Sequence, residues 1–217
     1  MNISSLMSIL AWIDYAVLAG CALWGAFCVV VVWRRIQQQR FRSEESQAEF
    51  MDQVEDALTA GDFETVTDLC EDDSRAMPQL VNLAVSNRDL GYSHLRHFVA
   101  DRFQRDILAD LEYRLSWVQT CIKSAPMLGL FGTVLGMVGA FGKLASGDKV
   151  DATSLAGDIS FALYTTAYGL AIAIPLIFAV AAINIRIRKL EDLVGLGLKR
   201  LFDVLKPLLA QTPVGGR

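Results

Sequence analysis

The sequence lacks the residue patterns on which most enzymes and metal sites depend. It has two histidines and four cysteines, with no CxxC pair and no secreted-domain spacing. His94 and His97 could share a helix face, but no third ligand accompanies them. No Walker loop, dinucleotide fingerprint or nucleophile–base pair is present. We therefore expect no enzyme, no cofactor, no metal site and no disulfide framework.

Charge is scarce in three long windows, although charged residues make up 20% of the chain and hydrophobic residues 53%. The formal net charge of −4, with no basic stripe carrying aromatics, gives no reason to expect nucleic acid as a partner. A soluble domain of 217 residues has too little interior to hide this much apolar surface. The uneven charge distribution predicts an all-α integral membrane protein.

Each of the three windows is long enough to cross a bilayer as a helix. The first covers 15–33, which would rise about 28 Å, close to the hydrocarbon thickness. The second covers 122–145. The third, 155–185, is longer than the bilayer core requires, so it should tilt or project. The short, turn-rich link 146–154 predicts an antiparallel hairpin between the last two spans.

Lysine and arginine predict the orientation of these spans. None occurs in residues 1–33, whereas eleven fall in 34–123 and seven in 186–217. By the positive-inside rule, residues 34–121 and the tail 186–217 should be cytoplasmic, with residues 1–14 and the hairpin outside. An N-terminus without Lys or Arg, and with no small-residue cleavage site after it, favours a retained anchor over a signal peptide.

Residues 34–121 show helical periodicity and little strand character. We expect helices around 50–58, over 63–70 and from Pro78 to Asn87. A longer helix should cover 94–118 and run on toward the second span. Its apolar face is formed by Leu95, Val99, Phe103, Ile107, Leu111, Leu115 and Val118. The charged opposite face is either a solvated surface or a subunit interface.

Small residues mark the second span as a packing helix. In lipid, close helix association needs small side chains that let backbones approach. Glycines recur every three or four residues, and the third span adds a glycine and a proline. The predicted helix-packing residues are Gly129, Gly132, Gly136, Gly139, Gly169 and Pro175.

Hydroxyl groups are unusually dense in the third span. They can bond to their own backbone, or they can line a pore or a partner helix. Thr133 of the second span should lie near the depth of Thr165 and Thr166, because the two helices are antiparallel. The predicted pore-lining residues are Thr133, Ser160, Tyr164, Thr165 and Thr166.

The predicted spans contain no mid-membrane Asp, Glu, Lys, Arg or His. Asp14 and Asp158 lie near span ends, toward the outside. Since ion relays usually need a titratable group inside the membrane, we expect another chain to supply it if this protein conducts ions.

Two stretches resemble a known family, the MotA/TolQ/ExbB proton-channel proteins, and in particular the shorter ExbB/TolQ branch. Residues 125–137, APMLGLFGTVLGM, are similar to its "APLLGLLGTVxGM" signature. Residues 159–175, ISFALYTTAYGLAIAIP, are similar to "ISEALxxTAxGLxxAIP". The four-span MotA branch fits less well, since three spans are predicted here.

The resemblance implies a ring, a pentamer in this branch, whose second and third spans line a central pore. A dimer of a small single-span partner similar to ExbD or TolR would sit inside and carry a membrane aspartate. Proton flow would then drive mechanical work on the envelope, and a TonB/TolA-like energy transducer is a further partner that the resemblance implies. The family's pore threonines correspond to Thr133 and Thr166. The implied location is the bacterial inner membrane, with a periplasmic N-terminus and a cytoplasmic C-terminus.

One position departs from the family pattern: Phe161 stands where the motif often has Glu. This favours an alternative, a non-conducting membrane scaffold that anchors a partner complex. A small-solute transporter is a weaker alternative, because no internal repeat is evident. Neither the conducted ion, H⁺ or Na⁺, nor the energised process follows from the residues.

Overall fold

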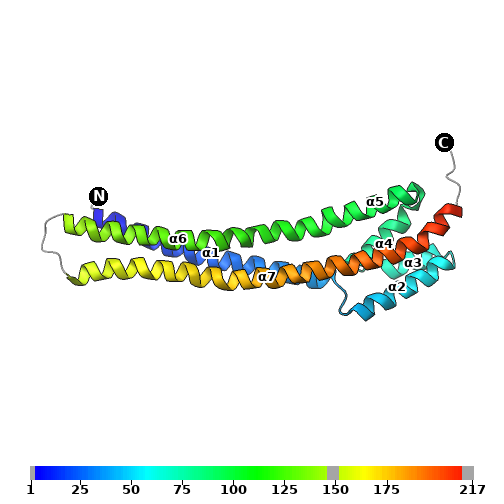
Figure 1. The fold of residues 1–217 in the computed structure, drawn as a ribbon, viewed down its shortest axis with the longest axis horizontal. Helices are drawn as coiled ribbons and strands as arrows, with labels where there is room; N and C mark the ends of the chain where they lie inside the picture. The colour runs from blue at the N-terminus through cyan, green and yellow to red at the C-terminus, as the bar shows by residue number, and fades with distance from the viewer. Residues whose placement is uncertain (1–2, 146–151, 212–217) are drawn as a thin grey trace. The chain divides into compact units, whose positions relative to one another are not determined.

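The computed structural model describes residues 3–145 and 152–211, and within these ranges every element is helical (Figure 1). The elements in chain order are α1 Ile3–Gln39, α2 Glu44–Thr59, α3 Phe63–Cys70, α4 Ala76–Ser86, the 3₁₀ turn Arg88–Leu90, α5 Tyr92–Arg102, the π-helical segment Phe103–Leu108, α6 Ala109–Ala145 and α7 Ala152–Gln211. Residues 146–151 of the predicted hairpin link lie outside the described residues.

Three of the described helical stretches are long and apolar enough to cross a membrane: Ile9–Gln39, Tyr92–Ala145 and Ala152–Leu209. The chain is therefore an integral, multi-pass membrane protein. Each stretch extends beyond the hydrocarbon requirement of about 20 residues. The limits of the bilayer along these helices stay a prediction.

The chain divides into two compact units, each built from separate parts of the sequence. The first comprises Met1–Val31 and Arg114–Ala182, and holds most of the charge-free sequence. The second comprises Val32–Tyr113 and Ile183–Arg217. Helices α1, α6 and α7 contribute residues to both units.

In the second unit, α2 to α5 and the C-terminal part of α7 bury a common apolar core. The core includes Val54, Leu58, Val66, Val81, Leu95, Val99, Leu190, Leu201 and Leu205. Residues 186–211 are thus not a loose tail: they continue α7, because their apolar side chains are buried in this unit. At Gly197, an added Cβ would meet Met77 Sδ at 2.7 Å, so the helix packs closely here.

The predicted apolar face of 94–118 is confirmed, since all seven of its residues are buried. In an ideal α-helix, each step of four residues places the next side chain about 40° further around the helix axis. Five such steps in a row would therefore carry the apolar residues away from one side of the helix. The π-helical segment Phe103–Leu108 takes up extra residues in the middle of the series. The face therefore stays directed at the core, and one helical run continues through Pro126 to Ala145.

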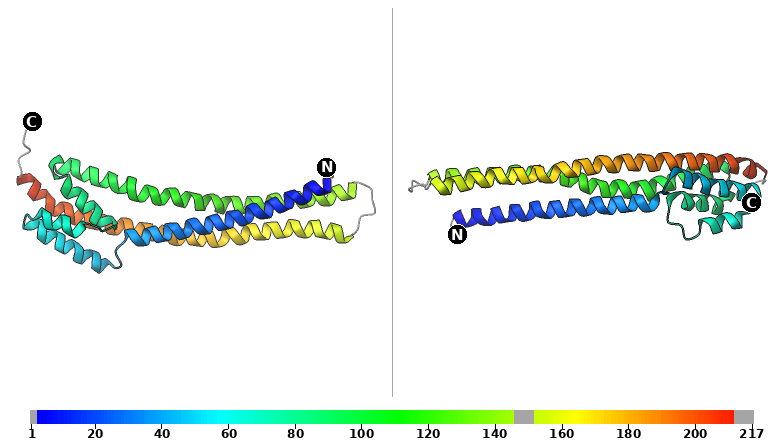
Figure 2. Two further views of the ribbon diagram at one scale, coloured as in Figure 1. Left: turned by 180° about the vertical axis from the view of Figure 1, so that it is seen from behind. Right: turned by 90° about the horizontal axis from the view of Figure 1, so that it is seen from below.

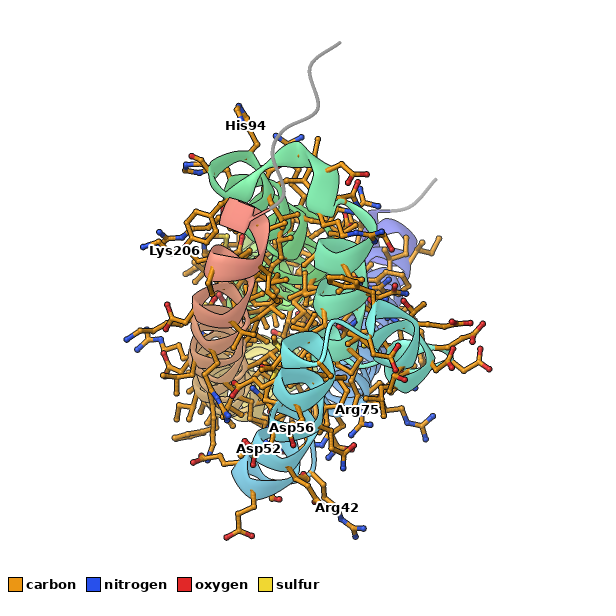
Figure 3. The ribbon with its side chains drawn as sticks, turned by 90° about the vertical axis from the view of Figure 1, so that its right-hand side faces the viewer. Arg42, Asp52, Asp56, Arg75, His94 and Lys206 are labelled. Carbon is orange, nitrogen blue, oxygen red and sulfur yellow. The ribbon has the colours of Figure 1, made fainter. Side chains whose placement is uncertain are left out.

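The charged face of the same helix carries pairs one turn apart. Arg102 contacts Asp106 at 2.5 Å and Arg105 contacts Asp101 at 2.9 Å. His94, the weak metal candidate, points outward from the helix surface (Figure 3). No group of three metal-ligand side chains occurs among the described residues.

The turn between α3 and α4 is held by an ion pair that we expect to be sensitive to pH. Arg75 Nε donates to both carboxylate oxygens of Asp73 at 2.9 Å, and its guanidinium lies 3.9 Å from the centre of the Phe41 ring. These hydrogen bonds lower the pKa of Asp73, against the opposing effect of burial. Asp73→Asn should therefore cost about 1 kcal/mol of stability at neutral pH, with allowance for solvent screening.

A carboxyl whose pKa is lowered on folding stabilises the folded protein at pH values above the ordinary pKa of about 3.9. This stabilisation is lost as the pH falls through the lowered pKa. The difference in stability between wild type and Asp73→Asn should thus be smaller at pH 3 than at pH 7. Thermal unfolding at pH 7 and pH 3 measures it. The exposed Asp68→Asn is the control; an equal loss in both variants would contradict the ion-pair explanation.

Candidate functional site

In the first unit, α6 and α7 lie side by side along a seam of glycines (Figures 1 and 2). A Cβ added at Gly129 would lie 2.7 Å from the backbone oxygen of Thr165, and one at Gly169 would lie 2.5 Å from that of Ala125. At Gly136 it would lie 2.7 Å from the backbone oxygen of Asp158. These glycines let the two backbones approach to a distance that no other residue permits.

Two threonine hydroxyls of α7 bond across this seam to the same atom. Thr165 Oγ1 lies 3.3 Å and Thr166 Oγ1 3.0 Å from the carbonyl oxygen of Gly129. Thr165 is fully buried and its hydroxyl also lies 3.0 Å from Ala162 O, whereas Thr166 is half-buried. The Thr165 hydroxyl is therefore buried between α6 and α7, and Thr166 lies at the accessible border of this seam.

The third partner at this level is α1, which brings Asp14 into the seam. A Cβ added at Gly132 would overlap the Thr165 side chain and lie 2.8 Å from Asp14 Oδ2. Asp14 is only 3% exposed, and neither carboxylate oxygen has a hydrogen-bond partner among the described residues. Asp14 is predicted to lie near the outer end of the first span, and that position along the bilayer stays a prediction; its place at the level of Thr165 was not predicted. Three helices place its carboxyl beside Thr165.

Aromatic side chains pack next to Asp14 between α1 and α7. The Tyr15 ring centre lies 5.4 Å from that of Phe161 and 6.1 Å from that of Tyr168, both in edge-to-face geometry. Tyr168 in turn stacks on Tyr164 at 6.4 Å. Phe161 thus fills its position with an aromatic contact and supplies no polar group there.

The other predicted site residues occupy different environments. Thr133 is half-buried, and its hydroxyl bonds back to Leu130 O at 2.6 Å. Ser160 and Tyr164 are exposed within the chain, as is Pro175, while Gly139 is half-buried. Any packing role of Pro175 would therefore be against lipid or another chain. Its assignment, like the pore-lining assignments, stays a prediction.

Few titratable groups surround the seam. On α6 none lies between Lys123 and Lys143, and on α7 only two tyrosines lie between Asp158 and Arg186. Asp158 itself is paired with Lys143 Nζ at 2.7 Å. The site therefore combines close helix packing, hydroxyls at one level and a single unpaired carboxyl, which suits binding or passage of a small cation better than covalent chemistry.

Comparison with known proteins identifies the family. The model of the MotA/TolQ/ExbB proton channel family matches residues 85–194, which contain the whole α6–α7 seam. The chain belongs to this family.

Among curated relatives, the chain is 36% identical over 91 residues to the biopolymer transport protein ExbB-like 2 of Helicobacter pylori, covering 42% of this chain and 59% of that protein. It is 34% identical over 85 residues to the Tol-Pal system protein TolQ of Haemophilus influenzae, covering 39% and 37%. It is 34% identical over 98 residues to the biopolymer transport protein ExbB of Xanthomonas campestris, covering 43% and 39%. The alignments thus span less than two thirds of these relatives.

These names support the ExbB/TolQ branch and a multi-pass protein of the inner membrane. The first helix lies outside the matched region, and with it Asp14. The sequence did not predict that Asp14 lies beside Thr165, because the predicted first span begins after it. The one available signal was its lone charge within an otherwise uncharged run from Met1 to Trp33.

Proposed function

We propose that this chain is the ring-forming channel subunit of an ion-driven motor of the ExbB/TolQ type. The observation that carries the proposal is the hydroxyl pair of Thr165 and Thr166 on Gly129 O, inside the region that the family model matches. Thr166, at the accessible border, is the hydroxyl best placed to contact a passing ion. Protons are the ion proposed.

The surfaces of α6 and α7 outside the seam support assembly with other chains. Large apolar side chains are exposed along both helices, including Leu130, Phe131, Val134, Phe141, Leu163, Ile174 and Phe178. In a ring, part of this surface would pack on neighbouring copies and the rest would face lipid. We propose a ring of five copies around a dimer of an ExbD/TolR-like partner. Each partner chain would be a single-span protein with a membrane aspartate.

The proposed orientation places the N-terminus in the periplasm and the second unit in the cytoplasm, because Arg34, Arg35 and the basic residues from Arg186 flank the charge-free segments. Arg186 stacks over the Trp33 ring at 3.8 Å. A tryptophan beside an arginine where both predicted spans end is typical of a membrane–water boundary.

A non-conducting scaffold is the second candidate, and the packing of Phe161 on Tyr15 favours it. An aromatic contact at this position contributes no polar group to an ion path. The scaffold would keep the ring and anchor a partner complex without ion flow.

Native mass spectrometry of the detergent-extracted protein, expressed with its genomic neighbours, tests the proposal. We expect five copies of this chain holding a small single-span protein whose membrane segment contains an aspartate. A monomer or dimer without such a partner would contradict the motor. A ring that retains its partner but gives no ion flux in liposomes would instead support the scaffold.

A further inference from the structure

Asp14 has the features of a binding site that the proposed pore threonines do not explain. Its side chain is 3% exposed, it lies on a helix that crosses the membrane, and both carboxylate oxygens lack a hydrogen-bond partner among the described residues. An ionised carboxylate in such surroundings is strongly disfavoured, because neither water nor a counter-charge among the described residues stabilises it. A purely structural position would be occupied more stably by an apolar residue.

Among the residues that the structure describes, no hydrogen bond or ion pair joins Asp14 to a cation. The seam of α6 contributes Gly132, and α7 contributes the Thr165 side chain. The next residue on α1 is Tyr15, whose ring packs on Tyr168 of α7, and Tyr168 stacks on Tyr164. The charged residues nearest to Gly132 and Thr165 along the two helices are Lys123 on α6 and Asp158 on α7, and Asp158 pairs with Lys143. The carboxyl can therefore be neutralised only by binding a small cation.

We propose that Asp14 is a proton-binding carboxyl inside the membrane-spanning unit of this chain, buried beside Gly132 and Thr165. The neutral acid is the form that fits the closed seam, and a movement of α1 that admits water would release the proton. Tyr164 and Tyr168 are more than half exposed, and their hydroxyls can both donate and accept a hydrogen bond. Tyr15 packs on Tyr168, so this row of phenols runs from the residue next to Asp14 to exposed positions on α7.

The functional role of Asp14 rests on the proposed motor. In that motor the chain would carry a proton site of its own, in addition to any aspartate of a partner. The binding itself does not depend on a motor and can be measured on the chain alone. The site differs from the threonine pair because it involves α1, which the family match does not include.

Carbodiimide labelling of the purified full-length chain tests the proposal. Dicyclohexylcarbodiimide reacts with a protonated carboxyl in apolar surroundings: the acid O–H adds across one C=N bond, and the adduct rearranges to a stable N-acylurea without a leaving group. Peptide mass spectrometry locates the added mass. At neutral pH we expect at least about tenfold more labelling at Asp14 than at Asp158, falling as the pH is raised.

Matched variants keep the result interpretable. Asp14→Asn should lose the label and keep the fold, since an amide of the same shape is neutral at every pH; Asp14→Glu should be labelled. Asp158→Asn should leave labelling of Asp14 unchanged. Absence of label at Asp14 from pH 5 to pH 9, or protection by Na⁺ but not K⁺ at constant pH, would overturn the proton site. Labelling without a ring or partner would leave it standing and sink only the motor.

Discussion

Alanine at Gly129 is expected to force α6 away from α7 and to lower the stability of the membrane-spanning unit. The added Cβ would lie 2.7 Å from Thr165 O and 2.9 Å from Thr166 Cα. Both are backbone atoms, so no side-chain rotation can relieve the overlap. Overpacking of this kind costs about 1–3 kcal/mol, and the upper end is expected here because the contact is with backbone. The hydroxyl bonds to Gly129 O would be strained at the same time.

Gly142→Ala is the matched control for this substitution. Gly142 lies on the same helix, and an added Cβ there meets no atom within 4 Å. Alanine is favoured over glycine in helices by about 1 kcal/mol, so both variants share that gain and differ only in the seam contact. Thermal unfolding in detergent, followed by tryptophan fluorescence, should show a lower unfolding midpoint than wild type for Gly129→Ala. The midpoint of Gly142→Ala should not fall. Equal midpoints would mean that the seam is not as close as described.

Valine at Thr166 is expected to abolish ion-driven function while leaving assembly intact. The substitution removes one half-buried hydroxyl with almost no change in shape, and Gly129 O keeps the bond from Thr165. A loss of at least about tenfold in activity is expected if the hydroxyl stabilises the passing ion by about 1.4 kcal/mol. Complementation of the ion-driven process reports activity, and native mass spectrometry reports assembly.

Two further substitutions separate the ion path from packing. Thr166→Ser keeps the hydroxyl and should restore activity. Thr120→Val removes a hydroxyl of α6 that bonds only to Ser116 O among the described residues, and should have no effect. Thr165→Val should mainly lower stability, by about 1 kcal/mol, because that hydroxyl is buried in the seam. Full activity of Thr166→Val would exclude this hydroxyl from the ion path.

Much of the fold follows from local pattern, because the bilayer restricts a spanning segment to a helix. Charge-free length alone predicts three spanning helices, and the structure has three helical stretches of that character. The small-residue spacing predicts close packing, and Gly129, Gly132 and Gly136 lie where an added Cβ would overlap α7. Periodicity likewise identified the buried face of 94–118, since burial of one helix face repeats every three to four residues.

The end of α7 could not be predicted in the same way. The basic residues from Arg186 indicate where a membrane segment ends, but they do not end a helix. The helix continues to Gln211 because residues such as Leu190, Leu201 and Leu205 are buried against α2 to α5. That burial depends on helices that are far away in sequence, which no local pattern reports.

The helical class, the spanning segments and the residue types of the α6–α7 seam can be predicted from the sequence, since each depends on composition and spacing within one helix. The bonds of the two threonines to Gly129 O, the packing of Phe161 on Tyr15 and the position of Asp14 beside Gly132 became known from the structure alone. These contacts depend on the axial offset and rotation of α1 and α7 against α6. Many small packing contacts between distant segments set that offset, and no single motif encodes it.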